Sequence, residues 1–191
     1  MTEHRVPDGY DQDMSEQIPY PRLATFPPGG YDKGRNALWQ AAWMGFQGLF
    51  FTKWWFPRRL RPVVLRFFGA TIAKDVTIRQ NVRVQWPWKL TIGADTWVGE
   101  DSWLYNVEPI TIGHDVCLSQ GAFVCTGSHD HNSSDFHCTN KPIVIEDGVW
   151  LCTQSLVLAG VTVGTGAVVG ARAIAFHDVP AGTSVRVGTV N

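Results

Sequence analysis

Aliphatic residues recur at intervals of six positions over the last quarter of the chain. The residues that share this register are Ile145, Leu151, Val157, Val163, Val169, Ala175, Ala181 and Val187. Small or β-branched residues lie four positions after each of the first seven: Val149, Ser155, Val161, Ala167, Ala173, Val179 and Val185. A period of six fits neither an amphipathic helix nor strict strand alternation. The pattern predicts a solenoid in which each short repeat stacks on the repeats of neighbouring turns.

The same register continues towards the N-terminus in triplets of aliphatic residues. The triplets are Ile72, Ile78 and Val84; Ile92, Val98 and Leu104; and Ile112, Leu118 and Val124. Between these triplets the spacing rises from six to eight, which predicts a two-residue bulge at one corner of each turn. We therefore predict an all-β fold, a triangular prism with three short strands per turn and the aliphatic positions pointing inwards.

One interval is much longer than the others. Val124 and Ile145 are 21 positions apart, where one repeat needs six. About fifteen residues, 128–142, are therefore expected to leave the prism as a protruding loop. A long loop within a compact repeat is usually functional. This loop carries three of the six histidines, His129, His131 and His137.

The chain divides into three segments by composition. Residues 1–32 are polar, acidic and rich in proline, and predict a poorly ordered arm or one that wraps a neighbouring subunit. Residues 33–70 are basic and rich in tryptophan, and between residues 33 and 74 there are eight Lys or Arg and no acidic residue. Residues 71–191 carry the repeats and form the expected β-helix domain.

The basic segment predicts two short helices ahead of the prism. The first has aromatic residues at helical spacing: Trp39, Trp43, Phe46 and Phe50. The second follows Pro57 and carries Leu60, Val64 and Phe67. Aromatic residues mixed with cations are typical of helices at a membrane surface, so residues 39–68 are a candidate for peripheral membrane contact. The alternative is that the segment caps the first coil or packs in a trimer.

Net charge, cysteine spacing and the length of apolar runs exclude several classes of function. The net charge of −1 gives no basic field, so we expect no nucleic-acid partner. The four cysteines show no CxxC spacing, which favours reduced thiols over disulfides or a zinc clip. The N-terminus lacks the apolar run of a secretory signal, and the longest apolar stretch, 41–51, is shorter than the ~20 residues that span a bilayer. We predict a cytoplasmic chain without a transmembrane helix.

Several stretches of the sequence resemble a known family. The most repetitive is KPIVIEDGVWLCTQSLVLAGVTVGTGAVVGARAIAFHDVP, with GSHDHNSSDF before it. These stretches are similar to the hexapeptide-repeat acetyltransferases. Further likeness to the colanic-acid-biosynthesis subfamily lies in FFGATIAKDVTI, in the pair Trp86–Pro87 and in YNVEPITIGHDVCLSQGAFVCTGSHD. The likeness covers roughly residues 34–188.

The resemblance implies more than the repeat pattern does. It implies a left-handed parallel β-helix, although parallel crossovers in general are right-handed. It implies an O-acetyltransferase that moves acetyl from acetyl-CoA to a sugar hydroxyl of a polysaccharide precursor. It also implies a homotrimer whose sites are shared between two prisms. Such an enzyme is expected in the cytoplasm or peripherally at the inner membrane surface.

The resemblance assigns the catalytic role to His129, in the element Thr126–Gly127–Ser128–His129. This histidine stands where a strand ends and the loop begins. Histidine changes protonation near neutral pH, so an imidazole there can accept the proton of a sugar hydroxyl as its oxygen attacks a thioester. The acceptor would contact Asn106 and Glu108, because the subfamily has a similar Asn-x-acid element in the turn before this histidine.

The resemblance also assigns a site for coenzyme A. The corresponding residues in this chain are Trp150, Thr153, Gly170, Ala171 and Arg172. Small residues at such corners let the pantetheine arm approach backbone amides, and one amide can stabilise the thioester oxyanion. For each of them, simple packing at a corner is the alternative.

The sequence departs from the family in three places. Cys152 replaces a usual glycine, Phe176–His177 replaces a small-polar and basic pair, and the ending VGTVN lacks the usual Gly-Asn-Pro-Ala element. The last departure concerns the adenine and phosphate contacts of coenzyme A, for which Arg172 and Arg186 are candidate replacements.

Three alternatives remain open at this point. A thiol, Cys125 or Cys138, can act as a covalent nucleophile near His129, although no third residue is evident to activate it. The loop histidines and Cys138 can bind zinc, as in carbonic anhydrases with the same prism, but the paired histidine spacing of those enzymes is absent, so we expect no metal. The chain can also be a non-catalytic scaffold or a membrane-recruited assembly factor.

Overall fold

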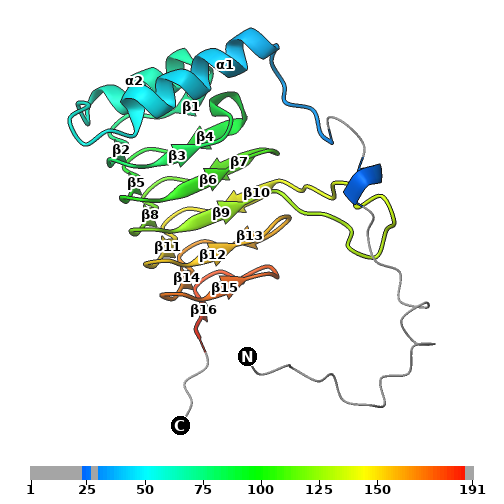
Figure 1. Cartoon of the computed structure of the whole chain (residues 1–191). Helices are drawn as coiled ribbons and strands as arrows, with labels where there is room; N and C mark the ends of the chain where they lie inside the picture. The colour runs from blue at the N-terminus through cyan, green and yellow to red at the C-terminus, as the bar shows by residue number, and fades with distance from the viewer. Residues whose placement is uncertain (1–22, 27–29, 188–191) are drawn as a thin grey trace, which may run out of the picture.

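The computed structural model describes residues 23–26 and 30–187, and its main body is a prism of three parallel sheets (Figure 1). We number the sheets in the order in which the chain first visits them. Sheet 1 contains β1 (Thr71–Ile72), β4 (Leu90–Ile92), β7 (Ile110–Ile112), β10 (Ile143–Ile145) and β13 (Thr162–Val163). Sheet 2 contains β2 (Thr77–Ile78), β5 (Trp97–Val98), β8 (Cys117–Leu118), β11 (Trp150–Leu151), β14 (Val168–Val169) and β16 (Ser184–Val185). Sheet 3 contains β3 (Arg83–Val84), β6 (Trp103–Tyr105), β9 (Phe123–Cys125), β12 (Leu156–Val157) and β15 (Ile174–Ala175). The predicted hexapeptide-repeat parallel β-helix is confirmed.

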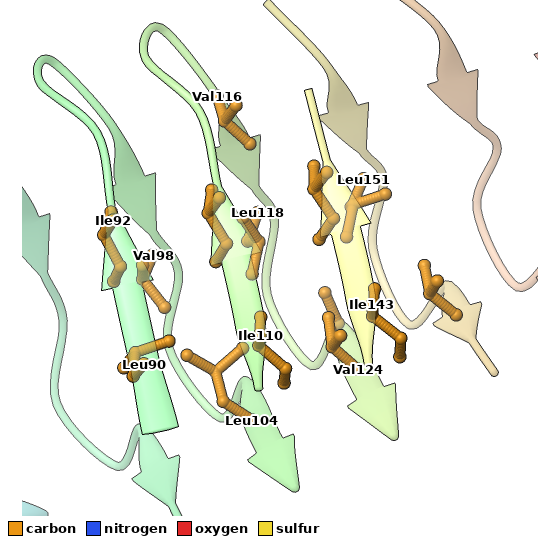
Figure 2. Close-up of a cluster of buried hydrophobic side chains, with 14 of the residues drawn as sticks. Leu90, Ile92, Val98, Leu104, Ile110, Val116, Leu118, Val124, Ile143 and Leu151 are labelled. Atoms are coloured by element: carbon orange, nitrogen blue, oxygen red, sulfur yellow. The ribbon is translucent and has the colours of Figure 1, made fainter. Parts of the chain in front are cut away.

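Strand pairing confirms the predicted register from Ile72 to Ala175. In sheet 1 the aliphatic residue of each strand lies beside that of the next, as Ile92 does beside Ile112. Such residues are almost completely buried, and Figure 2 shows Ile92, Val98 and Leu104 among the side chains that gather inside the prism. The core is therefore a stack of aliphatic layers, each covering the layer of the coil before it.

The last coil differs from the prediction. Val179, not Ala181, forms the bridge to Val163, and Val185, not Val187, lies beside Val169. Ala181 and Val187 are exposed, so their predicted inward positions were wrong. The connection after Ala175 is shorter than in the coil before, which moves the register back by two residues.

Changes in coil length concentrate at one corner of the prism, between sheet 3 and the sheet 1 strand of the next coil. We call it the sheet 3–1 corner. It consists of residues 85–89, 106–109, 126–142, 158–161 and 176–178. It holds the predicted two-residue bulges, the short helix η3 (Pro87–Lys89) and the long loop, as well as the shortened last connection.

Two helices cover the first coil, as expected. The helix α1 (Ala37–Phe46) continues into a π turn, η2 (Gln47–Phe51), and α2 (Leu60–Phe67) follows. The side chain of Asn36 caps α1 by accepting a hydrogen bond from the Trp39 amide at 3.0 Å. Trp43 is fully buried, and its indole Nε1 donates to the Val84 carbonyl at 3.0 Å.

The buried face of α2 differs from the expected stripe. Leu60 and Phe67 are exposed, and Leu65 takes the fully buried position. Arg61 is also buried, where it donates to the carbonyls of Phe51 and Lys53 at 3.1 and 2.8 Å. The Arg61 guanidinium therefore holds the end of η2 and the connection after it against α2. Burial lowers the pKa of Arg61.

Within the described residues, no helix has the length and apolar character needed to cross a bilayer. The expected arm, 1–32, falls mostly outside the described residues. Its described parts are the short helix η1 (Leu23–Thr25), Phe26 and residues 30–32.

Candidate active site

A cavity of about 490 Å³ opens at the sheet 3–1 corner, beside the long loop. Its walls come from the prism, the loop and the segment that precedes α1. The lining residues are Phe26, Gly30, Tyr31, Lys33, Tyr105, Val107, Gly127, His129, Cys138 and Asn140. The predicted catalytic histidine thus lies in the wall of a cavity large enough for a small organic substrate.

The long loop, residues 126–142, is ordered as a hairpin-like extension. Its two arms pair antiparallel, with the Thr139 amide donating to the Ser128 carbonyl at 2.8 Å and the Asp130 amide donating to the His137 carbonyl at 3.0 Å. The Asn140 side chain accepts from the Ser128 amide at 2.9 Å. These bonds hold the first arm, which carries His129, against the second arm, and the loop projects from the prism (Figure 1).

Gly127 and Thr126 fit the loop onto the coil beneath it. A Cβ at Gly127 would approach the ring of Tyr105 to 2.8 Å, so only glycine lets the chain pass there. The buried Thr126 hydroxyl donates to the Tyr105 carbonyl at 3.0 Å and accepts from the Glu108 amide at 2.9 Å. Packing and hydrogen bonding therefore explain why Thr126 and Gly127 precede His129.

Phe136 orients the imidazole of His129. The Nδ1 atom lies 2.9 Å from the Phe136 carbonyl oxygen, and the two rings stack with centroids 4.4 Å apart and planes 1° apart. A carbonyl only accepts hydrogen bonds, so this contact assigns the proton of the neutral ring to Nδ1. Nε2 then keeps its lone pair, which is the state that a general base requires.

The segment before α1 supplies a wall that the sequence did not predict. The Phe26 ring lies 5.6 Å from that of His129, centroid to centroid. The Tyr31 hydroxyl accepts from the Trp86 indole at 3.1 Å, and burial raises the pKa of Tyr31. Trp88 donates to the Lys33 carbonyl at 2.7 Å. Neither Phe26 nor Tyr31 belongs to a repeat, so no periodic signal could mark them.

The two candidate acceptor residues occupy different environments. Asn106 is fully buried, and its side-chain amide accepts from the Trp86 amide at 3.0 Å and donates to the Trp86 carbonyl at 2.6 Å. It braces this corner and does not line the cavity. Glu108 does not line the cavity either, but it follows the lining residue Val107 and is half-buried, with its carboxylate 4.0 Å from Lys89 Nζ.

The candidate coenzyme A residues lie along another part of the prism. Trp150 is on β11 in sheet 2, where its indole donates to the Ser119 hydroxyl at 2.9 Å. Thr153, Gly170, Ala171 and Arg172 lie at the sheet 2–3 corner (79–82, 99–102, 119–122, 152–155 and 170–173). There the Arg172 amide donates to the Thr153 carbonyl at 3.0 Å. The structure therefore brings these residues together with one another, but places them at a different corner from His129.

A protein of Escherichia coli (strain K12), WcaF, named as a candidate colanic acid biosynthesis acetyltransferase, is 44% identical to this chain over 162 residues. The match covers 83% of this chain and 87% of that protein. This chain belongs to the hexapeptide-repeat acetyltransferases. The serine acetyltransferase of Bacillus subtilis (strain 168) is 28% identical over 90% of the chain and 66% of its own length. No protein-family model matches the chain.

Solved structures of hexapeptide-repeat acetyltransferases share the fold. A Vibrio cholerae acetyltransferase complexed with acetyl coenzyme A aligns with a TM-score of 0.72 at 22% identity, covering 87% of this chain and 96% of that one. A maltose O-acetyltransferase from Clostridium difficile 630 aligns with a TM-score of 0.71 at 22% identity, covering 81% and 88%. These likenesses support the parallel β-helix.

The thiols near the candidate site of this acetyltransferase are poorly suited to nucleophilic attack. Burial raises the pKa of Cys125, so its thiol is harder to ionise than a free cysteine. Cys138 lines the cavity from the second arm of the loop, opposite His129 in the pairing. Among the described residues, no ion pair or hydrogen bond is found that would activate either sulfur. The Cys125 thiol donates only a weak hydrogen bond, to the Gly127 carbonyl at 3.5 Å.

The other two loop histidines, His131 and His137, do not line the cavity. His137 Nδ1 is 3.0 Å from Asp135, whose pKa is lowered to about 2 by hydrogen bonds from Ser133 and His137. His131 is exposed at a turn and does not line the cavity. In the part of the chain that the structure describes, no three His, Cys, Asp or Glu side chains gather as a metal site, so the zinc alternative has no ligand set there.

Proposed function

We propose that this acetyltransferase moves the acetyl group of acetyl-CoA to a hydroxyl of a sugar acceptor in surface-polysaccharide biosynthesis. The observation that carries the proposal is His129, which lines a cavity of about 490 Å³ and whose Nδ1 lies 2.9 Å from the Phe136 carbonyl oxygen. The similarity to WcaF supports the acceptor class, and the acetyl coenzyme A complex of the Vibrio cholerae acetyltransferase supports the donor.

In this mechanism His129 acts as a general base. Its Nε2 takes the hydroxyl proton while the acceptor oxygen attacks the thioester carbonyl carbon. The tetrahedral intermediate then collapses, the carbon–sulfur bond breaks, and the imidazolium returns the proton to the leaving thiolate. The backbone amide of Ala171 is the proposed contact for the donor or its oxyanion, because the Gly170 amide already donates to the Val185 carbonyl at 2.8 Å. Glu108 and Tyr31 are the proposed contacts for the sugar, whereas Asn106 braces the corner from within the protein.

Acetyl-CoA is expected to stabilise the folded chain. At a concentration 100 times its Kd, a ligand that binds only the folded state adds about 2.7 kcal/mol to the free energy of unfolding. Thermal denaturation with and without acetyl-CoA measures this effect. Arg172→Ala should reduce the shift, because its exposed guanidinium is the proposed phosphate contact. An unchanged melting temperature at millimolar acetyl-CoA would favour the non-catalytic scaffold.

We propose a homotrimer, because the two proposed half-sites are separated within one prism. In one prism, His129 lies at the sheet 3–1 corner and the proposed donor residues lie at the sheet 2–3 corner. A closed three-fold assembly can bring the first corner of one protomer against the second corner of the next, giving three equivalent sites. We expect light scattering at assay concentration to give three times the chain mass. An active monomer would contradict this arrangement.

A further inference from the structure

The exposed face of α1 and η2 carries no charged residue. The exposed residues of these elements are Ala37, Leu38, Ala41, Ala42, Met44, Gly45, Gly48, Leu49 and Phe50. Leu38 and Leu49 have exposed fractions of 81% and 66%. At about 100° per residue, the exposed positions of α1 lie together on the side opposite the buried Trp43. The outer surface of α1 and η2 is therefore continuously apolar.

The two glutamines of α1 and η2 are half-buried and bond to the backbone. The Gln47 side chain accepts from the Val84 amide at 2.7 Å, and the Gln40 side chain donates to the Arg35 carbonyl just before α1. The side that faces the protein carries Trp39, Trp43 and Phe46, so the helix is apolar on both sides. A helix that is apolar all round is normally covered on every side, so the exposed side is expected to be covered by something other than water.

Aromatic residues extend the apolar face beyond α1. Phe50 contacts Trp55, with ring centroids 6.0 Å apart, and Trp39 contacts the exposed Phe67 at 5.8 Å. Trp54, next in the chain to Trp55, has an exposed fraction of 80%. We call these residues together with the exposed residues of α1 and η2 the cap face. Exposed apolar patches of this extent usually mark an interaction site.

The segment that forms the cap face is strongly cationic, although Asp75 lies near Arg58 and Arg59, and Glu100 and Asp101 lie near Lys53. Residues 33–74 contain eight Lys or Arg and no acidic residue. Lys53, Arg58 and Arg59 are exposed, and none of the ion pairs found in the described residues involves them. Such a surface is complementary to an anionic partner. Two copies of it placed face to face would instead bring like charges together.

We infer that the cap face docks on an anionic membrane surface, with α1 and η2 lying in the plane of the interface. The apolar side chains would enter the boundary between headgroups and acyl chains, and the exposed cations would contact anionic lipid headgroups. Trp54 and Trp55 suit this boundary because the indole ring is apolar with a polar N–H. The ten-residue α1 is too short to span the bilayer, so it lies on one leaflet.

Sedimentation of the full chain with vesicles tests this inference. Vesicles of phosphatidylcholine with phosphatidylglycerol should bind the chain at low salt, and vesicles of phosphatidylcholine alone should bind it much less. Leu38→Glu and Leu49→Glu should each lower partitioning about tenfold, because each removes a buried apolar contact and adds a repelled charge. Phe176→Glu is the matched control, since Phe176 is exposed by 63% in the last coils, at the other end of the prism (Figure 1).

The other outcomes separate the rival occupants. Absence of binding to anionic vesicles at low salt overturns the inference, and so does an equal loss in Phe176→Glu. Concentration-dependent association that Leu49→Glu abolishes, without vesicle binding, would assign the cap face to a second copy of the chain. Thiol release with a soluble sugar acceptor should be unchanged in Leu49→Glu, which keeps this test independent of the proposed function. Unchanged melting temperatures would show that the exposed substitutions leave folding intact.

Discussion

His129→Ala is expected to lower kcat for acetyl transfer by about 10²–10⁴-fold, the usual contribution of a positioned general base. The KM for acetyl-CoA should change little, because the imidazole acts on the acceptor hydroxyl in the transition state and not on the bound donor. Release of the coenzyme A thiol, followed with a thiol reagent across a panel of sugars, measures both constants. A kcat within tenfold of the unchanged chain would contradict the assignment.

Three substitutions in the same loop serve as controls for His129. His131→Ala, His137→Ala and Cys138→Ser should each lose less than about tenfold, since none of them removes the proposed proton acceptor. A loss in Cys138→Ser as large as in His129→Ala would favour the covalent route. Equal damage in the three histidine variants, with turnover abolished by a chelator, would restore the zinc alternative.

Leu118→Ala is expected to lower the free energy of unfolding by about 3–5 kcal/mol, within the range for leucines deleted from tight cores. Leu118 is almost completely buried in β8, between Val98 and Leu151 of the adjacent coils. The substitution removes contacts on both sides and leaves a cavity that a stacked prism cannot easily close. Urea denaturation at fixed chain concentration measures the loss, because stability depends on concentration if the chain assembles.

Ile174→Ala is the matched control for the core. Ile174 is in β15 of the same prism, but its side chain points outwards and is 46% exposed. Its truncation should cost less than about 1 kcal/mol, as is usual for surface positions in a strand. A similar loss in both variants would mean that the inward positions do not carry the stability of the prism.

The repeat register could be predicted because each inward position in the prism has the same environment. From Ile72 to Ala175 the repeated aliphatic positions form stacked layers, and the longer spacings fall at the sheet 3–1 corner. The last coil escaped prediction because Ala181 and Val187 match the period in sequence while a shortened connection shifts the strands. Likewise, the spacing predicted the existence of α2 but not that Leu65 would face the prism, since packing against the first coil decides that.

The candidate site was only partly visible in the sequence. His129 stood out because it lies where the loop begins and because the family resemblance assigns it the role of base. Phe136 and Tyr31 did not, because their roles depend on a stacked ring in the loop and on contacts with Trp86, far away in sequence. Asn106 matched the Asn-x-acid element of acceptor binding, but its side-chain amide instead bonds both the amide and the carbonyl of Trp86 inside the corner.

The concentration of length changes at the sheet 3–1 corner has an evolutionary consequence. Ile110 still pairs with Ile143, although the long loop separates their strands in sequence. The prism thus tolerates an insertion there at little more than the entropy of loop closure, which rises by only about 0.6 kcal/mol for each doubling of loop length. The loop can therefore be lengthened, shortened or exchanged between relatives while the strands keep their partners. Changes in this loop can therefore alter which acceptor is bound while the stability of the coils stays the same.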